Sequence, residues 1–539
     1  MAIIGKNVIE NLTTAMYEDL KIIYREYIQN SADSIDHAKA EKIIEDNDAR
    51  IEIDINPNKR YIHILDNGTG IKADAFEKTM SSIADSKKDR ESDKGFRGIG
   101  RLGGISSCNK LVFKCSAYNE PIQSCFTWDA KKVKEILAND DFNPTASELV
   151  DAVTSYSTEP AQPEEHFFSV ELIDVDKSAG ELLDAENVIK YLQAVAPVPY
   201  HSAFYLSAKI REYAKQHDFY IDTYNIYVNG EQLFKNYTEK FYEPYNNKRK
   251  KAYDKLIDLK FEILKDNHDK VLAWMWYGIS NFEKAIPVIN QMRGIRLRKG
   301  NIQIGDEQTF TSHGFYKESR GAQYFVGEVF AVHPDLIPNA RRDYFNLNNT
   351  CRTFEEKLRP LLYDKFYQLY HRANDSKNAF KRMQEYEDAK SQYEEKEINN
   401  EFISSDERQN EEKKLKEKEK QAREAKRKLD SWKEKYKNDD VLSKIYESQD
   451  EKYKTISSSN TKVKNNGSKV GNSRTKSTES RKKKRDAYLT SDLTQYSKKE
   501  QKLISHIYTI LKEILPPDLA EPTVAIIQEK LKRSAGKTK

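Results

Sequence analysis

Three short segments near the start of the chain combine polar residues and glycines in a way that can do chemistry. Residues 26–33 read EYIQNSAD, residues 66–71 read DNGTGI, and residues 95–104 read GFRGIGRLGG. Each pattern alone has an ordinary explanation, because Glu-x-x-x-Asn is usually a polar helix face and Asp-Asn-Gly-Thr-Gly is usually a turn. Their order and spacing together favour a site for a phosphorylated ligand.

The residue types match what ATP hydrolysis requires: a base for the attacking water, a metal ligand, phosphate donors and a group that recognises adenine. Glu26 can serve as the base, and Asn30 offers a neutral oxygen suited to Mg²⁺. Asp66 can accept a hydrogen bond from the adenine amino group. Gly68 and Gly70 allow the backbone to approach the ring closely.

The third segment presents backbone N–H groups where a helix is expected to begin. Gly95, Gly98 and Gly100 can therefore donate to phosphate oxygens, with the helix dipole adding to the attraction. Residues 98–103 also match the G-x-G-x-x-G dinucleotide pattern. That reading fails on context, because a charged stretch rather than a strand precedes it.

Local patterns predict the elements that carry these residues. Apolar positions at helical spacing over residues 9–38 predict a helix that holds Glu26, Asn30 and Asp33. Residues 50–55 and 61–65 alternate around a turn and predict a hairpin whose second strand ends at Asp66. Further strands are expected at 110–116, 123–128 and 166–175. Because helices and strands alternate without a regular βαβ period, we expect an α+β sandwich.

The three segments resemble the N box and the two Gly boxes of the GHKL superfamily of ATPases, which includes gyrase B, the ninety-kilodalton heat-shock chaperones, histidine kinases and MutL. The resemblance implies a Bergerat-type ATPase domain over 1–215, a mobile lid over 72–100, and ATP and Mg²⁺ as cofactors. Glu26 is then the base and Asn30 the metal ligand. The implied nucleotide-binding residues are Asn30, Asp33, Asp66, Gly68, Gly70, Ser86, Lys87, Gly95, Gly98, Ile99 and Gly100.

Residues 216–375 resemble the ribosomal S5-like transducer domain that follows the ATPase in the chaperones, MutL, gyrase and MORC proteins. There a basic residue reaches the γ-phosphate, and the Asn-Ala-Arg-Arg run at 339–342 implies Arg342 for that role, with Arg341 as the alternative. One departure stands out. The family's Gly-Thr-x-Val-x-Leu strand corresponds to residues 167–172, FFSVEL, without the Gly-Thr.

The remaining residues are increasingly charged. Residues 376–450 predict either a coiled coil or a solvated single helix, because Leu415, Ala422, Leu429 and Tyr436 recur every seven positions. Residues 451–490 are expected to form a basic disordered linker, with ten basic residues and one acidic residue between 455 and 485. Residues 491–539 predict a small helical module that can dock a protein partner.

Composition excludes several classes. The four cysteines lack a Cys-x-x-Cys pair and the start lacks a signal sequence, which predicts a reduced cytoplasmic protein without a cysteine-ligated metal. No window is apolar enough to span a membrane. No helical pair precedes the first motif to carry a phosphoacceptor histidine, which argues against a histidine kinase.

Two functions fit these features. The first is a MORC-like, homodimeric ATP-gated clamp on nucleic acid, which binds DNA through residues 455–485 without sequence preference. The second is a chaperone-like or signalling ATPase that acts on a protein through its C-terminal helices. The abundance of Lys, Asn, Ile and Tyr suggests an AT-rich bacterial genome and, by analogy alone, a role in antiviral defence.

Overall fold

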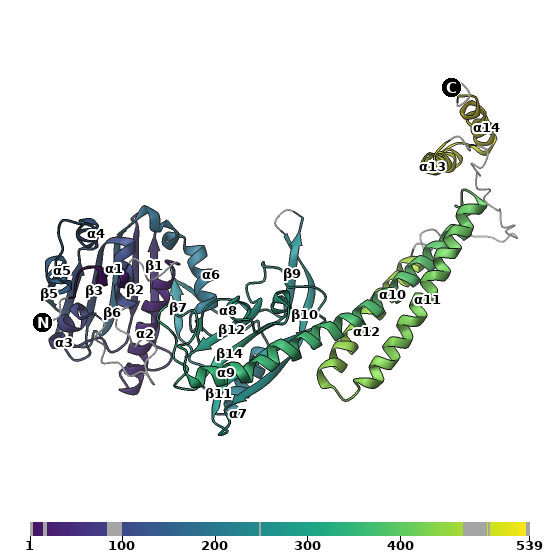
Figure 1. The fold of residues 1–539 in the computed structure, drawn as a ribbon. Helices are drawn as coiled ribbons and strands as arrows, with labels where there is room; N and C mark the ends of the chain where they lie inside the picture. Colours follow the sequence, from purple (N-terminus) through teal and green to yellow (C-terminus); the bar gives the residue numbers. More distant parts are fainter. Residues whose placement is uncertain are drawn as a thin grey trace, which may run out of the picture. The chain divides into compact units, whose positions relative to one another are not determined.

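The computed structural model describes residues 4–13, 19–83, 100–246, 249–466, 493 and 496–534. The chain divides into two compact units, Met1–Tyr370 and His371–Lys539. The first contains two β-sheets with their covering helices, and the second is helical (Figure 1). The mixed α and β architecture predicted from the sequence is confirmed.

The first sheet has eight strands in the order β5-β4-β3-β6-β2-β1-β7-β8. Residues alternate between buried and exposed along its central strands, so one face is packed against the core. The strands are β1 (Arg50–Asn56), β2 (Tyr61–Asp66), β3 (Cys108–Ser116), β4 (Ile122–Trp128), β5 (Thr154–Pro160), β6 (Phe167–Val175), β7 (Asn225–Val228) and β8 (Glu231–Gln232).

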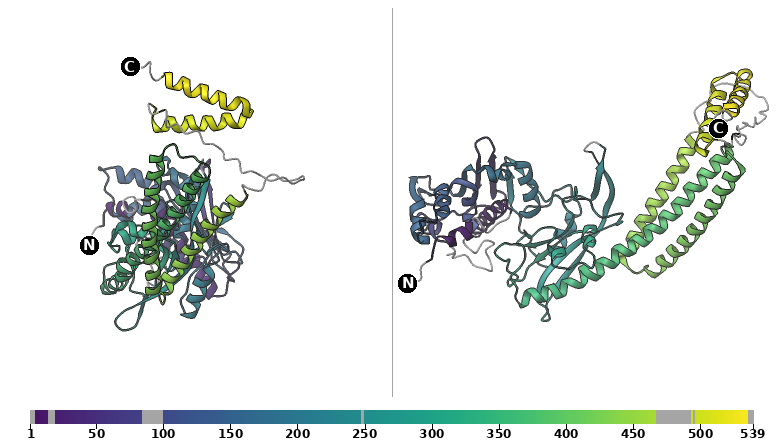
Figure 2. Two further views of the ribbon diagram at one scale, coloured as in Figure 1. Left: turned by 90° about the vertical axis from the view of Figure 1, so that its right-hand side faces the viewer. Right: turned by 45° about the horizontal axis from the view of Figure 1, so that its top comes forward.

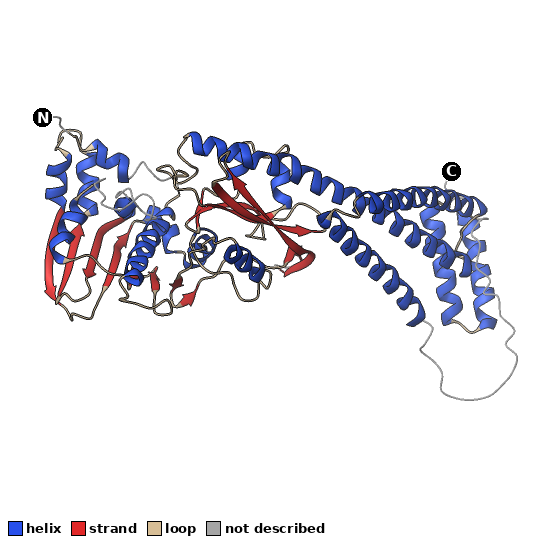
Figure 3. Cartoon of the chain, turned by 90° about the horizontal axis from the view of Figure 1, so that it is seen from below, coloured by secondary structure: helices blue, strands red, loops and turns tan. Residues whose placement is uncertain are grey.

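Helices gather on one side of this sheet (Figure 3). The helix α2 buries Ile23, Tyr27 and Ile35 in the core shared with the isoleucines of β1 and β2. This core therefore fixes the helix that carries the first motif. The helical segments here are α1 (Asn7–Thr13), α2 (Ile22–Ala40), α3 (Ala73–Ser81), η1 (Gly100–Ser107), α4 (Ala130–Ala138), α5 (Ala146–Val153), η2 (Lys177–Leu183) and α6 (Ala185–Val195). The next helix, α7 (Ser207–Gln216), packs in the core of the second sheet.

The first sheet extends further along the chain than the sequence predicted. The strand β7 pairs in parallel with β1, with Arg50 opposite Asn225 and Ile53 opposite Val228. The predicted boundary between residues 215 and 216 is thus too early, because the hairpin at 225–232 completes the first sheet. A pairing across more than 150 residues leaves no local sequence signal.

The second sheet has six strands in the order β13-β12-β14-β11-β10-β9. Its central strand β11 is buried along almost its whole length, because α7 packs against the face that carries Trp274 and Trp276, and Phe366 lies against Tyr277 of the other face. The strands are β9 (Lys240–Tyr245), β10 (Arg249–Lys265), β11 (Val271–Ser280), β12 (Gly294–Lys299), β13 (Ile302–Ile304) and β14 (Val326–Ala331), and the short helices are α8 (Thr309–Ser312) and η3 (Ser319–Tyr324).

A fully buried ionic network lies in this second sheet. The Glu328 carboxylate accepts hydrogen bonds from Lys235 Nζ at 3.0 Å, from Trp276 Nε1 at 3.2 Å, and from Arg298 and Tyr200. Burial by itself raises the pKa of the Glu328 carboxyl. The charges of Arg298 and Lys235 outweigh that effect and lower the pKa to about 2.

This network predicts acid sensitivity. Because the folded-state pKa of Glu328 lies below its usual 4.5, its carboxylate stabilises the fold above that pH, by about 3 kcal/mol. The contribution is lost as the pH falls from 4.5 toward 2. We expect Glu328→Gln to lower the urea midpoint, by an amount that shrinks over this range. Urea unfolding followed by tryptophan fluorescence measures it, and Glu186→Gln, at an exposed position, is the control. A difference that does not change with pH contradicts the assignment.

Helices join the second sheet to the rest of the chain. The helix α9 (Asn349–Arg359) continues through a π-helical turn, η4 (Pro360–Lys365), into the long helix α10 (Phe366–Ile398). Proline at position 360 removes an N–H donor, and this accounts for the irregular turn.

The second unit contains a helical bundle. The helices α10, α11 (Ser405–Lys435) and α12 (Asp440–Asn466) run side by side (Figure 2), and α13 (Lys498–Ile514) and α14 (Pro517–Ser534) follow. Ala425 and Leu429, from the predicted heptad stretch, pack against Phe380 of the same chain. Helix α12 reaches Asn466, so helical structure continues past the predicted start of the linker at 451. Among the described residues, no helix is long and apolar enough to cross a membrane.

Candidate functional site

Helix α2 carries the predicted base and metal ligand. Glu26 is 8% exposed, and Asn30, one turn later, is half-buried. Asp33 is buried on the same helix. A helix that buries an arginine, a glutamate and an aspartate in addition to its apolar face is not explained by packing alone. The pattern indicates that α2 forms one wall of a polar site.

The Glu26 carboxylate lies between two guanidinium groups. Its Oε1 atom is 3.3 Å from Nε of Arg342 and 3.5 Å from Nη2 of Arg25. Arg342 lies between β14 and the next helix, more than 300 residues after Glu26 in the chain. This contact therefore joins the α2 wall to the segment that follows β14.

A tight loop holds Arg342 in place. The backbone N–H of Asn339 donates to the Tyr344 carbonyl at 2.9 Å, and the Arg342 N–H donates to the Asn339 carbonyl at 3.1 Å. Gly305, after β13, donates its N–H to the Arg342 carbonyl at 2.8 Å. Arg342 has a φ of 55°, a left-handed conformation that residues other than glycine rarely adopt. The neighbouring Arg341 is exposed, whereas Arg342 is 8% exposed.

Asp66 ends β2 on the core side and is 1% exposed. Its Oδ1 atom accepts the Gly68 N–H at 3.0 Å. A Cβ on Gly68 would lie 2.1 Å from Oγ of Ser34 on α2, and one on Gly70 would lie 2.2 Å from the Ser116 carbonyl oxygen. Gly70 also has a φ of 67°. The glycines of the second motif are thus required for the loop to pass this close to α2 and β3.

The helix η1 begins directly against the Glu26 side chain. A Cβ on Gly100 would lie 2.4 Å from Oε2 of Glu26, so no larger residue fits there without movement. The Tyr27 hydroxyl donates to the Arg101 carbonyl and accepts the Gly104 N–H, both at 3.1 Å. These contacts hold the described end of the third motif beside the first.

Comparison with known proteins decides the family of this region. The family model of the histidine kinase-, DNA gyrase B- and HSP90-like ATPases matches residues 17–159. Those residues form a GHKL ATPase domain. The match contains the first and second motifs and the described part of the third. No curated protein shows a significant match to the chain.

Five residues of the predicted GHKL site lie outside the described residues: Ser86, Lys87, Gly95, Gly98 and Ile99. Of the predicted residues, the structure therefore brings together Glu26, Gly100 and Arg342 around one carboxylate, with Asn30 and Asp33 further along the same helix. Asp66, Gly68 and Gly70 line the neighbouring loop, which the Thr69 N–H joins to the Ser34 carbonyl of α2 at 3.3 Å.

The GHKL strand that lacks Gly-Thr is β6. Phe168 stands where the family has threonine, and it pairs with Asp66 across the β2–β6 ladder. Its ring lies 6.0 Å from that of Phe113 and 6.4 Å from that of Phe76. An aromatic ring beside Asp66 offers apolar contact instead of a hydroxyl.

Sequence reasoning missed several residues that shape the GHKL site. Arg25 was overlooked because residues adjacent on a helix do not normally face the same partner. His166 Nδ1 lies 2.8 Å from the Gly68 carbonyl oxygen. The Cys115 sulfur accepts the Ile71 N–H at 2.9 Å, and burial raises the pKa of that thiol to about 12, so it remains protonated at neutral pH. The contacts of His166 and Cys115 with the second motif can be seen only in the folded structure.

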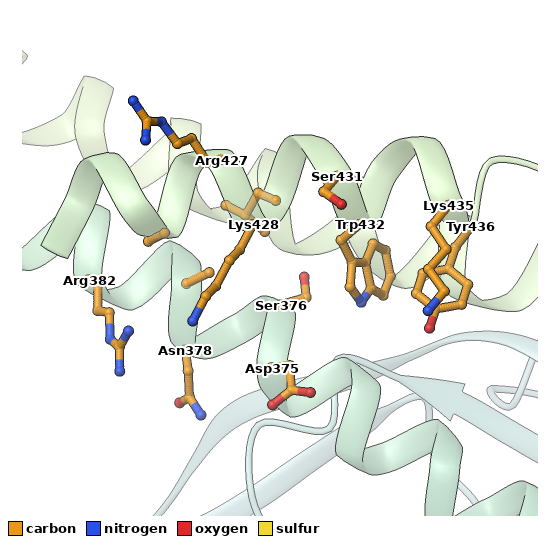
Figure 4. Close-up of a pocket in the computed structure, with 13 residues that line it drawn as sticks. Asp375, Ser376, Asn378, Arg382, Arg427, Lys428, Ser431, Trp432, Lys435 and Tyr436 are labelled. Carbon is orange, nitrogen blue, oxygen red and sulfur yellow. The ribbon is translucent and has the colours of Figure 1, made fainter.

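The second unit has a separate concave feature. A groove of about 590 Å³ lies between α10 and α11 (Figure 4). Its lining includes four cationic side chains and one carboxylate, and none of the predicted nucleotide-binding residues. The charged members are Asp375, Arg382, Arg427, Lys428 and Lys435. The excess of positive charge suits an anionic segment of a ligand.

Proposed function

We propose that the chain is an ATP-hydrolysing machine whose nucleotide state is transmitted from the GHKL domain to the second sheet. The observation that carries this proposal is the contact between Glu26 and Arg342. Both residues are buried and charged, and each is held by a different part of the first unit. A phosphate group placed beside Glu26 lies within reach of Arg342, because the two side chains already touch.

The chemical roles follow from position. Glu26 orients and deprotonates the attacking water. Asp66 accepts a hydrogen bond from the adenine amino group while it holds the Gly68 N–H. Gly100 provides the space that lets the phosphate-side backbone lie against Glu26. Charge develops on the phosphate oxygens during transfer, and the Arg342 guanidinium is the group that stabilises it.

The donor set beside Glu26 also fits Mg²⁺. The described residues contain no cluster of three or more His, Cys, Asp or Glu side chains that could hold a metal alone. Mg²⁺ usually takes one or two protein oxygens and completes its shell with water and phosphate oxygens. The Asn30 amide oxygen would hold the ion, which would neutralise charge on the phosphates. The protein would then supply one neutral metal ligand, the amide oxygen of Asn30 on α2.

Replacement of Arg342 tests the switch. We expect Arg342→Ala to lower kcat for ATP hydrolysis about 10²-fold or more, with a much smaller change in ATP affinity, because an arginine on the transferred phosphate acts mainly in the transition state. Steady-state kinetics and equilibrium ATP binding measure the two effects. Arg341→Ala is the matched control, since that side chain is exposed. If the two variants have equal activity, Arg342 has no role in catalysis.

Nucleic acid is the partner class that we favour, with ATP-dependent dimerisation closing a clamp around it. The support is electrostatic: the basic groove of the second unit and the cluster Arg481–Arg485 both suit a phosphate backbone. All four cysteines are free, which fits the cytoplasmic setting that we propose. The sequence-independent mode follows because phosphate contacts carry no base information.

DNA retention by the full-length chain tests this partner class. We expect binding that weakens steeply with salt, and a shallower dependence after residues 481–485 are changed to glutamine. Size-exclusion chromatography with light scattering, in the presence and absence of a non-hydrolysable ATP analogue, reports dimerisation. Absence of DNA binding by the wild-type chain excludes the clamp.

A protein partner is the alternative, and one observation favours it. The last two described helices expose apolar side chains at helical spacing: Leu503, Ile507 and Ile510 on α13, and Leu519 and Ile526 on α14. Exposed apolar residues grouped in this way are typical of a protein interface. The double variant Ile507→Asp and Ile526→Asp tests this alternative. Loss of the protein's function in the cell, with normal DNA binding and ATP turnover, would support a protein partner at these helices.

A further inference from the structure

An extended arm projects from the second sheet. The strand β10 has 17 residues, but it pairs with β11 only from Leu256 onward. Its first residues pair with β9 alone, with Arg249 opposite Tyr245 and Lys251 opposite Glu243. Residues 240–246 and 249–255 therefore form a two-stranded arm, which Figure 1 shows extending beyond the other strands of the sheet.

The described residues of the arm carry an excess of positive charge, with five cationic side chains and two carboxylates. Arg249, Lys250 and Lys251 are exposed, and none of them has an ion-pair partner among the described residues. The acidic side chain on the facing strand, Glu243, is paired with Lys284 instead. Asp254 is buried and bonded to Asn281. Lys284 and, more weakly, Lys251 lower the pKa of the Glu243 carboxyl, so the carboxylates of the arm offset only part of its positive charge.

Each face of the arm pairs a lysine with a tyrosine. Lys250 Nζ lies 4.6 Å from the centre of the Tyr242 ring, and Lys251 Nζ lies 6.0 Å from that of Tyr245. Successive residues of a strand point to opposite faces, so these two pairs occupy opposite faces of the arm. Cation–π contact orients a lysine while its ammonium group remains accessible. Tyr245 is itself 54% exposed.

We propose that the two described strands of this arm, residues 240–246 and 249–255, bind duplex DNA by lying in a groove between the two phosphate backbones. A two-stranded β-ribbon fits the major groove of B-form DNA, and an arm with cations on both faces meets both of its phosphate walls. Three exposed cations near the end of the arm, Arg249, Lys250 and Lys251, would release counterions from the backbone on binding. The inference rests on the nucleic-acid function proposed above and names the element that makes the contact.

A structural explanation competes with this one. The strand β9 is an edge of its sheet, and proteins often protect exposed edges with lysines and prolines such as Pro244. Protection predicts aggregation when the cations are removed, with no change in DNA affinity. DNA binding predicts the reverse. The two explanations therefore differ in a measurable way.

The test compares two triple variants of the full-length chain. Arg249→Ala, Lys250→Ala and Lys251→Ala together remove the cations of the arm. Lys131→Ala, Lys177→Ala and Lys215→Ala together remove the same charge from exposed positions on α4, η2 and α7. Fluorescence anisotropy with a labelled duplex of arbitrary sequence gives the dissociation constant between about 50 and about 200 mM salt.

We expect the arm variant to bind about 10-fold or more weakly at low salt and to lose about 2.7 from the slope of log affinity against log salt, which is the value for three phosphate contacts. The control variant should bind like the wild type, and both should hydrolyse ATP normally. Equal binding by the wild type and the arm variant overturns the inference, whether or not the variant aggregates. Failure of the wild type to bind overturns the nucleic-acid function as well.

Discussion

Glu26→Gln is expected to bind ATP with near-normal affinity and to hydrolyse it about 10²- to 10⁴-fold more slowly, which is the usual contribution of a general base. Glutamine keeps the size and hydrogen-bonding capacity of the side chain, so the contacts of residue 26 with Arg25 and Gly100 can persist. What is lost is the ability to take a proton from water. Single-turnover hydrolysis and equilibrium binding of a fluorescent ATP analogue separate the two quantities.

The control for this variant is Glu181→Gln. Glu181 is a solvent-accessible carboxylate that pairs with Lys21, the residue just before α2, and does not contact Glu26. Its loss should leave turnover within a factor of about two, because surface ion pairs contribute little. Normal turnover in the Glu26 variant would require a different base and would remove the central role assigned to α2.

Asp66→Ala is expected to lose ATP binding altogether at ordinary nucleotide concentrations, a weakening of about 10²-fold or more. The change removes both the acceptor for the adenine amino group and the acceptor that the Gly68 N–H now uses. A buried donor left without a partner costs about 1–3 kcal/mol, and the adenine contact is lost in addition. Isothermal titration with ATP measures the effect.

Asn67→Ala, one residue later, is the matched control. The Asn67 side chain accepts the Arg50 N–H at 2.9 Å and donates to the Asp48 carbonyl at 2.8 Å, so it holds the loop to the start of β1. Its loss should lower stability by about 1 kcal/mol and leave ATP affinity nearly unchanged. Equal losses of affinity in the two variants would mean that Asp66 acts through loop structure and not through adenine.

The local parts of the site could be predicted from the sequence. Glu26 and Asn30 lie within one helix, and Asp66 ends a strand, so short-range periodicity was sufficient to place each of them. Family resemblance added Arg342, whose partner lies far away in the chain. No pattern within ten or twenty residues could have revealed its contact with Glu26.

The other differences have long-range causes as well. The strand β7 joins the first sheet by pairing with β1, and the boundary predicted at residue 216 ignored that possibility. Leu429 repeats at heptad spacing with its neighbours, yet it packs within its own chain against Phe380. A heptad pattern specifies an apolar stripe and not the molecule that covers it. In both cases two structures fit the local sequence equally well, and contacts with distant residues decide between them.

The loop that holds Arg342 against Glu26 has a thermodynamic consequence beyond catalysis. If ATP binding shifts this loop toward one position, a partner that binds better to that position raises ATP affinity by the same factor by which ATP raises the affinity for the partner, because coupling between two sites is reciprocal. Gly305 directly follows β13 of the second sheet, and its N–H donates to the Arg342 carbonyl, so it connects that sheet to the loop. A partner bound to the second sheet would therefore set the ATP concentration at which the enzyme becomes half-saturated.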